Sequence, residues 1–224
     1  MEVNNRFLLA VLACALFGGS GCALTSKAAV VQTRYFSPET GPARVTASEA
    51  SDTSDTSSPS APAPAEAIAV RLGRVYSGQN LRERIVYRDH AYERGYYEDE
   101  RWTEWPEAYV RRALGRAFYE SHRFKRAIGG TAPTVEVEVI AFDDLRLHSG
   151  RAARVELQLI VFEGSEVLGE DTVTVDSPVA VGQPGIENVV AAMSNALDRA
   201  VEQIAARVGE VVRTRAAPTA SVTP

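Results

Sequence analysis

Residues 134–178 read TVEVEVIAFDDLRLHSGRAARVELQLIVFEGSEVLGEDTVTVDSP, and apolar residues alternate with polar ones in three runs of this stretch. The runs are VEVEV at 135–139, VELQLIV at 155–161 and VTV at 173–175. Alternation with a period of two is typical of strands that bury one face. Gly150 and Gly164 lie between the runs and supply turn residues. The stretch therefore predicts an antiparallel meander of three strands.

Two amphipathic helices flank this meander. Pro106 is placed to open the first helix, because proline fits the first helical position. Its apolar residues share one face at spacings of three and four: Val110, Ala113, Leu114, Ala117 and Phe118. The second helix is predicted over residues 186–212, with a stripe formed by Val190, Met193, Leu197, Val201, Ile204 and Val208. We expect both stripes to pack on the sheet, and a contact between subunits is the alternative for the second.

Three β-prone segments precede the first helix, at residues 29–36, 68–72 and 81–87. The resulting order of elements is β-β-β-α-β-β-β-α. This order predicts an α+β fold, in which a mostly antiparallel sheet carries two helices packed on one face of a single domain.

Only part of the 224 residues has the composition of a folded domain. Residues 46–66 contain no large apolar side chain, so we predict a disordered Ser/Thr/Pro/Ala-rich insertion at about 40–66, with a cell-wall-spanning linker as the alternative. We predict a domain over residues 22–212 and a disordered tail over 213–224. The net charge of −5 argues against a nucleic-acid-binding protein, because such proteins are usually basic.

The N-terminus has the features of an export signal. Its apolar run, residues 7–17, is too short to cross a bilayer core, which needs about 20 helical residues. Residues 1–21 are therefore predicted to be a signal peptide. Ser20, Gly21 and Cys22 resemble a bacterial lipobox, which predicts a lipoprotein signal with Cys22 as the acylated residue, although Gly19 stands where such signals usually carry Leu. Cys14 is the rival site, and export with an unmodified cysteine is the other alternative. Ala23 rather than Asp after Cys22 favours the outer membrane.

No catalytic constellation is visible in the sequence. His90, His122 and His148 do not stand at metal-ligand spacing, and the sequence contains neither a nucleophile motif nor a phosphate-binding loop. We expect Asp143 and Asp144 to occupy a solvated turn at a strand end. The chain is predicted to be no enzyme and to use no metal and no cofactor.

Charge and aromatic residues are unevenly distributed. Residues 71–126 hold 13 Lys and Arg against 9 Asp and Glu, whereas residues 127–212 hold 5 against 14. This asymmetry in charge is expected to orient a head-to-tail contact in a homo-oligomeric ring. The alternative is that the charged residues of each half only interact with solvent. Tyr, Trp and Arg are frequent in interface hot spots. The candidate partner- or ligand-binding residues are therefore Tyr87, Arg88, Tyr96, Tyr97, Arg101 and Trp102, with a core position as the alternative for Trp102 and for the tyrosines.

The stretch IVYRDHAYERGYYEDERWTEWPEAYVRRALGRAFYESHRF at residues 85–124 resembles the ABC-type transport auxiliary lipoproteins, which include the paraquat-inducible protein C-like lipoproteins. The matching positions are IVYR at 85–88, Tyr97, RW at 101–102 with Pro106, and Ser121 with Phe124, and Tyr35 matches a tyrosine of the first strand. The resemblance covers about residues 22–212. RVYSG at 74–78 replaces a proline-containing turn of the family, and the insertion is longer than usual.

The resemblance implies a non-enzymatic, lipid-anchored component on the periplasmic face of the outer membrane of a Gram-negative bacterium. Such a component would dock a substrate-carrying protein of the mammalian-cell-entry type, within a trans-envelope lipid transport system whose ATPase is another chain. The alternatives are a stand-alone lipid- or glycan-binding lipoprotein and a structural lipoprotein of envelope assembly.

Overall fold

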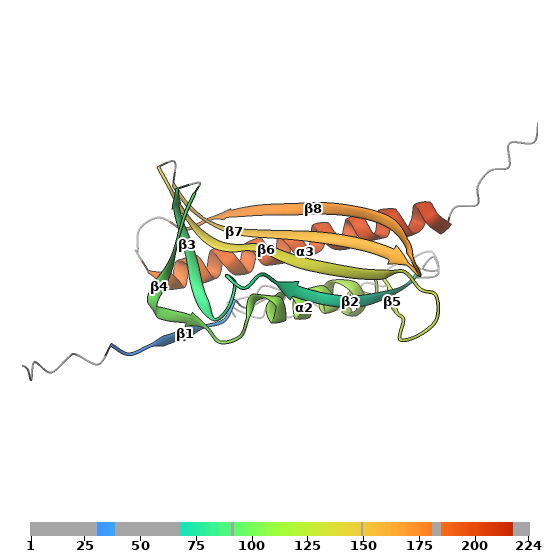
Figure 1. Ribbon diagram of the computed structural model, residues 1–224, viewed down its shortest axis with the longest axis horizontal. Coiled ribbons are helices and arrows are strands. Elements are labelled where there is room, and N and C mark those ends of the chain that lie inside the picture. Colours follow the sequence, from blue (N-terminus) through green and yellow to red (C-terminus); the bar gives the residue numbers. More distant parts are fainter. Residues whose placement is uncertain (1–30, 39–67, 91, 149, 181–184, 217–224) are drawn as a thin grey trace, which may run out of the picture. The chain divides into compact units, whose positions relative to one another are not determined.

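The computed structural model describes residues 31–38, 68–90, 92–148, 150–180 and 185–216 (Figure 1). The helices and strands among these residues belong to one unit, Thr33–Pro224. The predicted signal peptide, Cys14, Cys22 and the predicted insertion at 40–66 lie outside the described residues.

The three predicted strands of the meander are present and long. They are β6 (Thr134–Leu147), β7 (Gly150–Glu163) and β8 (Glu166–Pro178). Each pair is antiparallel, and the apolar positions lie side by side, as in Val137 opposite Leu159 and Val155 opposite Val175. Gly164 has a φ of 61° in the tight β7–β8 turn, a left-handed conformation that favours glycine. The meander is therefore confirmed.

The rest of the sheet is built on one edge of β6. β2 (Ala69–Ser77) and β3 (Arg84–His90) both pair with β6 in parallel, β2 along its first half and β3 opposite residues 143–145. β4 (Glu93–Trp102) returns antiparallel to β3. Two short strands pair in parallel at the margins, β1 (Arg34–Phe36) with β4 and β5 (Lys125–Arg126) with β2.

The eight-stranded sheet is thus mixed, whereas the sequence predicted a mostly antiparallel one. The parallel pairs arise because β6 runs in the same direction as β2 and β3, which precede it in the chain, while β4, the last strand before the first helix, runs in the opposite direction. Side-chain alternation shows which residues face the core but carries no information on strand direction. The α+β class and the single domain are confirmed.

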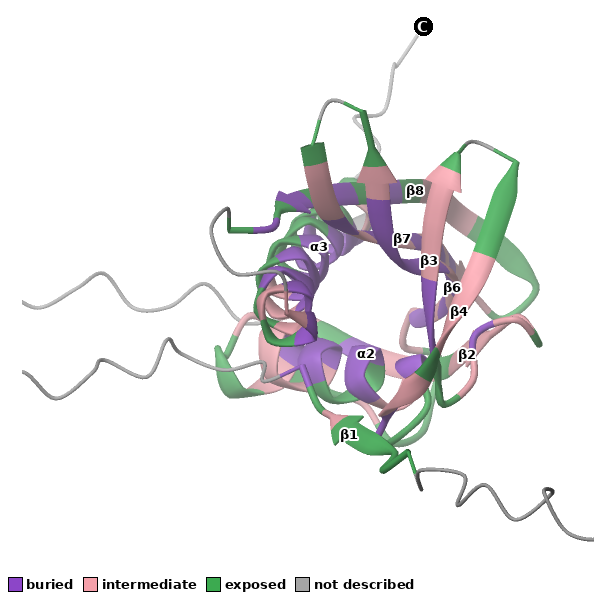
Figure 2. Ribbon diagram, turned by 90° about the vertical axis from the view of Figure 1, so that its left-hand side faces the viewer, coloured by how far each residue is buried: buried purple, intermediate pink, exposed green. Residues whose placement is uncertain are grey.

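Two helices cover one face of the sheet. α2 (Pro106–Gly115) has Pro106 at its first turn, and a π-helical turn over Arg116–Glu120 extends it. α3 (Ile186–Ala216) continues past position 212, where the sequence predicted its end. α2 packs against β2 and β6, α3 packs against β7 and β8, and the two helices contact each other. Figure 2 shows the buried residues of both helices and of the sheet facing one another, so the core lies between these layers.

Candidate functional site

The six residues predicted to bind a partner or ligand lie on two neighbouring strands. Tyr87 and Arg88 belong to β3, and the others, Tyr96, Tyr97, Arg101 and Trp102, belong to β4. Strand β4 itself was not predicted, because its charged and aromatic residues do not alternate in polarity. The antiparallel pairing of β3 with β4 brings the six residues into one hairpin, but their environments differ.

Trp102 belongs to the hydrophobic core. Its side chain is 1% exposed and lies edge-on to Tyr109 and Phe142, with ring centroids 6.2 and 5.4 Å away. Edge-to-face aromatic pairs of this kind add to the free energy gained by burial. Trp102 therefore joins β4 to α2 and β6, and its side chain offers almost no surface to a partner.

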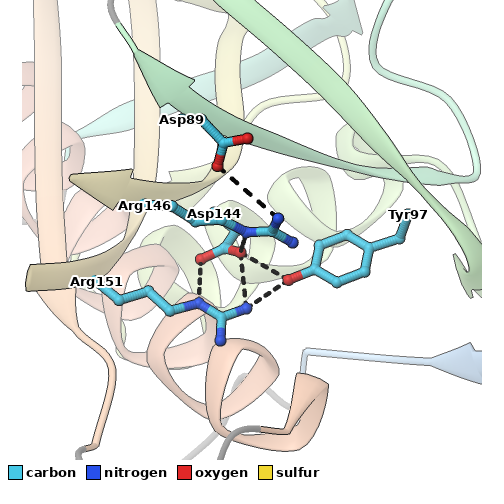
Figure 3. Close-up of polar contacts among 5 residues, drawn as sticks. All are labelled: Asp89, Tyr97, Asp144, Arg146 and Arg151. Atoms are coloured by element: carbon cyan, nitrogen blue, oxygen red, sulfur yellow. Dashed lines mark hydrogen bonds and ion pairs between the residues drawn. The ribbon is translucent and has the colours of Figure 1, made fainter. Parts of the chain in front are cut away.

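A charged cluster, here called the Asp144 cluster, lies at the end of the sheet where β3, β4, β6 and β7 meet (Figure 3). The Asp144 carboxylate is fully buried. Arg151 donates two hydrogen bonds to it, one to each oxygen and each 2.8 Å long. Tyr97 donates a third at 2.7 Å and Arg146 a fourth at 3.1 Å. Asp89 lies 3.8 Å from the outer side of Arg146 and completes the cluster.

These contacts set the protonation of Asp144. Burial by itself opposes ionisation, but the hydrogen bonds from Arg151 and Tyr97 outweigh it and hold the pKa of Asp144 below its ordinary value. Burial and the hydrogen bond to Asp144 raise the pKa of Tyr97, so its hydroxyl stays a donor. A carboxylate that already accepts four hydrogen bonds has little capacity left to accept a proton from a substrate. The geometry indicates a structural role for Asp144.

A second set of ion pairs lies on the opposite face of these strands. Arg88 bonds to the fully buried Asp143, and Arg154 of β7 lies opposite Asp143 in the strand register. Arg154 in turn forms two 2.7 Å hydrogen bonds with Asp176 of β8. The expectation of a solvated turn at Asp143 and Asp144 was therefore wrong, because β6 continues through both residues and each is matched by arginines.

Tyr87 is held in place from three sides. It lies opposite Gly95 in the β3–β4 pair, and a Cβ atom at Gly95 would lie 2.2 Å from the ring. Tyr97 meets its ring edge-on at 5.6 Å, and the Arg146 guanidinium lies 3.8 Å from its centroid. The lack of a side chain at Gly95 therefore lets the tyrosine lie flat across the strand.

Tyr96 and Arg101 have smaller structural contacts. Tyr96 lies beneath the guanidinium of Arg84, 4.8 Å from its ring centroid. Arg101 donates hydrogen bonds to the backbone oxygens of Tyr97 and Glu100, 3.0 and 2.9 Å long. Both side chains are half-buried, so each retains some surface.

The exposed surface of this region lies beyond the cluster, at two neighbouring turns. We call it the hairpin tip and define it by His90 and Tyr92 at the β3–β4 turn and Leu147 and His148 at the β6–β7 turn. Tyr92 is fully exposed and Leu147 is 45% exposed. The rings of His90 and His148 lie 6.0 Å apart, so the two turns are side by side, as Figure 1 also shows. The sequence prediction did not include these four residues, although Tyr92 lay within the aromatic stretch.

Two further observations concern metals and membranes. In the part of the chain that the structure describes, no three His, Cys, Asp or Glu side chains gather closely enough to hold a metal ion. Neither α2 nor α3 combines the length and the apolar character that a membrane span requires, and these are the α-helices of the described residues.

Comparison with known proteins places this architecture in a known group. The family model described as "ABC-type transport auxiliary lipoprotein component" matches residues 50–205. A Xanthomonas campestris crystal structure assigned to family DUF330 superposes with a TM-score of 0.61 at 20% identity, covering 69% of this chain and 93% of that one. An uncharacterised protein superposes with a TM-score of 0.54 at 13% identity, covering 63% and 92%. No curated protein matches the sequence.

Proposed function

The chain belongs to the family of ABC-type transport auxiliary lipoprotein components, and on this basis we propose that it docks the substrate-carrying partner of a trans-envelope lipid transport system at the outer membrane. The partner is of the mammalian-cell-entry type, and the chain is held at the periplasmic face by a lipid on Cys22. It acts as an accessory part, and the transport ATPase is another chain.

The family match over residues 50–205 carries this proposal. The arrangement of charges agrees with it, because the two buried carboxylates in the candidate region are both ion-paired. A protein that acts by docking needs a stable scaffold with an exposed contact surface.

We place the docking surface at the hairpin tip. Tyrosine and histidine side chains combine apolar area with hydrogen-bonding groups, and tyrosine is frequent among the residues that dominate interface energies. The Asp144 cluster lies next to this surface, because its members Asp89 and Arg146 directly precede His90 and Leu147.

The docking role is tested by cross-linking in cells followed by purification of the tethered protein. We expect recovery of a mammalian-cell-entry partner with the wild-type chain and at least a tenfold lower yield with Tyr92→Ser combined with Leu147→Ser. Val167→Ser is the matched control, because Val167 is 59% exposed at the opposite end of β7 and β8. Recovery that is unchanged in the double variant would remove the hairpin tip from the proposal. Failure to recover any such partner would remove the docking role itself.

The anchor is tested separately. Cys22→Ser should move the protein from the membrane fraction to the soluble periplasmic fraction, and Cys14→Ser should leave it on the membrane. Release by Cys14→Ser alone would move the modified residue to Cys14. Density-gradient separation of the two membranes checks the outer-membrane location.

A homo-oligomeric ring is part of the same proposal. The outer face of the sheet carries the acidic residues Glu136, Glu138, Glu156 and Glu170, whereas arginines gather near α2 and β5. Opposite charges on different faces favour a head-to-tail contact between copies. Size-exclusion chromatography with light scattering of the purified chain distinguishes a ring from a monomer.

A further inference from the structure

A groove rich in arginine lies between α2, its π-helical extension and the strands β2 and β5. Its volume is about 580 Å³, and we call it the arginine groove. The charged residues that line it are five arginines and one acid: Arg71, Arg111, Arg112, Arg116, Arg126 and Glu120. This groove is remote from the residues that the sequence singled out as a site.

Most of these arginines lack a carboxylate partner. Arg112 pairs with Glu104, but the ion pairs that the structure gives among the described residues include none of the other four arginines. Two of those four reach only backbone oxygens, Arg71 that of Gly130 at 3.1 Å and Arg111 that of Gly73 at 2.8 Å. The groove is therefore strongly positive.

Tyr119 forms a fixed part of the groove. Its hydroxyl accepts a hydrogen bond from the backbone nitrogen of Leu72 at 2.8 Å, and the Arg126 guanidinium lies 4.3 Å from the centroid of its ring. Stacking on an aromatic face holds a guanidinium in place while its N–H groups remain available. Arg126 is therefore positioned in advance for a ligand.

Two of the arginines that line the groove each bury one guanidinium nitrogen without an acceptor. Within the described residues, Arg71 Nε and Arg116 Nη2 have no hydrogen-bond partner. Asp198 of α3 lies on the far side of Arg116 but forms no ion pair with it in the structure. A buried donor without an acceptor is unfavourable, so these two arginines cost the fold some stability.

We propose that the arginine groove binds a phosphate group, either on a lipid headgroup or free in solution. The planar fork of N–H donors on arginine matches phosphate oxygens, and the arginines that lack a carboxylate partner supply such donors along the groove. Leu72 and the 91% exposed Ile128 also line the groove, and they offer apolar surface next to the charge. The inference is independent of the docking role.

The acidic outer face of a second copy is a less suitable occupant. Its glutamates stand on a sheet surface, whereas the arginines line a groove. A small tetrahedral anion can enter where a sheet surface cannot. Self-association through the groove is nevertheless a defined outcome of the test.

The test is calorimetric titration of the full-length chain in a non-ionic detergent at low salt. The probes are inorganic phosphate, glycerol 3-phosphate, dihexanoyl phosphatidylglycerol and dihexanoyl phosphatidylcholine. We expect saturable binding of at least one phosphate probe at one site per chain. Arg116→Gln combined with Arg126→Gln should weaken it at least tenfold. Arg74→Gln combined with Arg94→Gln removes the same charge from exposed positions outside the groove and should change it less than twofold.

The probes distinguish the two sources of phosphate. Binding of phosphatidylglycerol at least tenfold tighter than that of inorganic phosphate assigns a lipid ligand, and equal binding assigns free phosphate. The proposal is overturned if no phosphate probe saturates, or if the control pair weakens binding as much as the groove pair. It is also overturned if the groove pair abolishes self-association measured by light scattering while phosphate does not bind.

Discussion

The Asp144 cluster and the arginine groove both concentrate guanidinium groups. Those of the cluster have a buried carboxylate as partner, whereas most of those in the groove have no carboxylate partner. In the cluster, Arg151 and Arg146 converge on one buried carboxylate, and every oxygen of that carboxylate accepts hydrogen bonds. In the groove, Arg71 and Arg116 each bury a nitrogen that has no acceptor within the described residues. The first arrangement is complete within the fold, whereas the second leaves two donors without acceptors.

The difference separates structural charges from binding charges. A matched buried pair stabilises the fold chiefly because breaking it leaves an uncompensated charge. An unmatched guanidinium destabilises the fold and is retained where it serves another purpose. Substitutions in the two regions should therefore change stability in different directions.

The largest effect is expected for Asp144→Asn. The substitution leaves Arg151 and Arg146 close together without the compensating charge. We expect a loss of about 3 kcal/mol in the free energy of unfolding, the low end for breaking a buried ion pair. The low end applies because the two arginine side chains keep 30% and 34% of their surface in water. Urea denaturation followed by circular dichroism measures it.

Asp176→Asn is the control for this prediction. Asp176 forms two hydrogen bonds with Arg154, but its side chain is 44% exposed, so the loss should be below about 1 kcal/mol. Equal losses for Asp144→Asn and Asp176→Asn would show that the contribution of Asp144 to the free energy of unfolding does not depend on its burial.

A second effect of the cluster is a dependence of stability on pH. Because the pKa of Asp144 is lowered in the folded state, its ionised form stabilises the fold above the ordinary value of 3.8. This contribution is lost as the pH falls through the lower folded-state pKa. The difference in unfolding free energy between wild type and Asp144→Asn should be constant from pH 5 to 7 and shrink below about 3.8. A difference that stays constant down to pH 2 would contradict the assignment.

Much of the fold was predictable because its signals are local. The alternation of Val135, Val137 and Val139, and the apolar stripe of α3, each follow from one segment's own contact with the core. The parallel pairing of β2 and β3 with β6 was not predictable, because it depends on where a long connection delivers the chain. Strand β4 was missed because both of its faces carry polar and aromatic residues.

The sequence predicted where the candidate site lies but not what its residues do. Composition identified the stretch around Tyr97 and Arg101, which the hairpin does bring together. It could not reveal that Asp144 lies beneath Tyr97, since that contact joins residues 47 positions apart. The arginine groove is assembled from β2, α2 and β5, so no single stretch of sequence displays it. The only signal available was the positive charge of residues 71–126.

Gly95→Ala should have an intermediate effect. The added Cβ would fall 2.2 Å from the Tyr87 ring, and Arg146 and Tyr97 restrict the movement of that ring. We expect a loss of about 1–3 kcal/mol, typical of overpacking. In a Tyr87→Ala background the same substitution should be neutral or slightly stabilising. A double-mutant cycle in urea measures the coupling between the two positions. Additive losses would mean that the packing of the Tyr87 ring does not depend on the lack of a side chain at Gly95.

The smallest effect, and the most direct contrast with the cluster, is expected for Arg116→Met. Methionine retains much of the volume of the arginine stem but removes the charge and the buried nitrogen that lacks an acceptor. Without ligand, the free energy of unfolding should stay within about 0.5 kcal/mol of wild type or rise slightly, because an unsatisfied donor is removed. Arg151→Met, measured in the same urea series, should instead lose about 3 kcal/mol, because it leaves Asp144 without its principal partner. Similar losses for the two variants would mean that Arg116 stabilises the fold as Arg151 does. The proposed difference between the Asp144 cluster and the arginine groove would then be wrong.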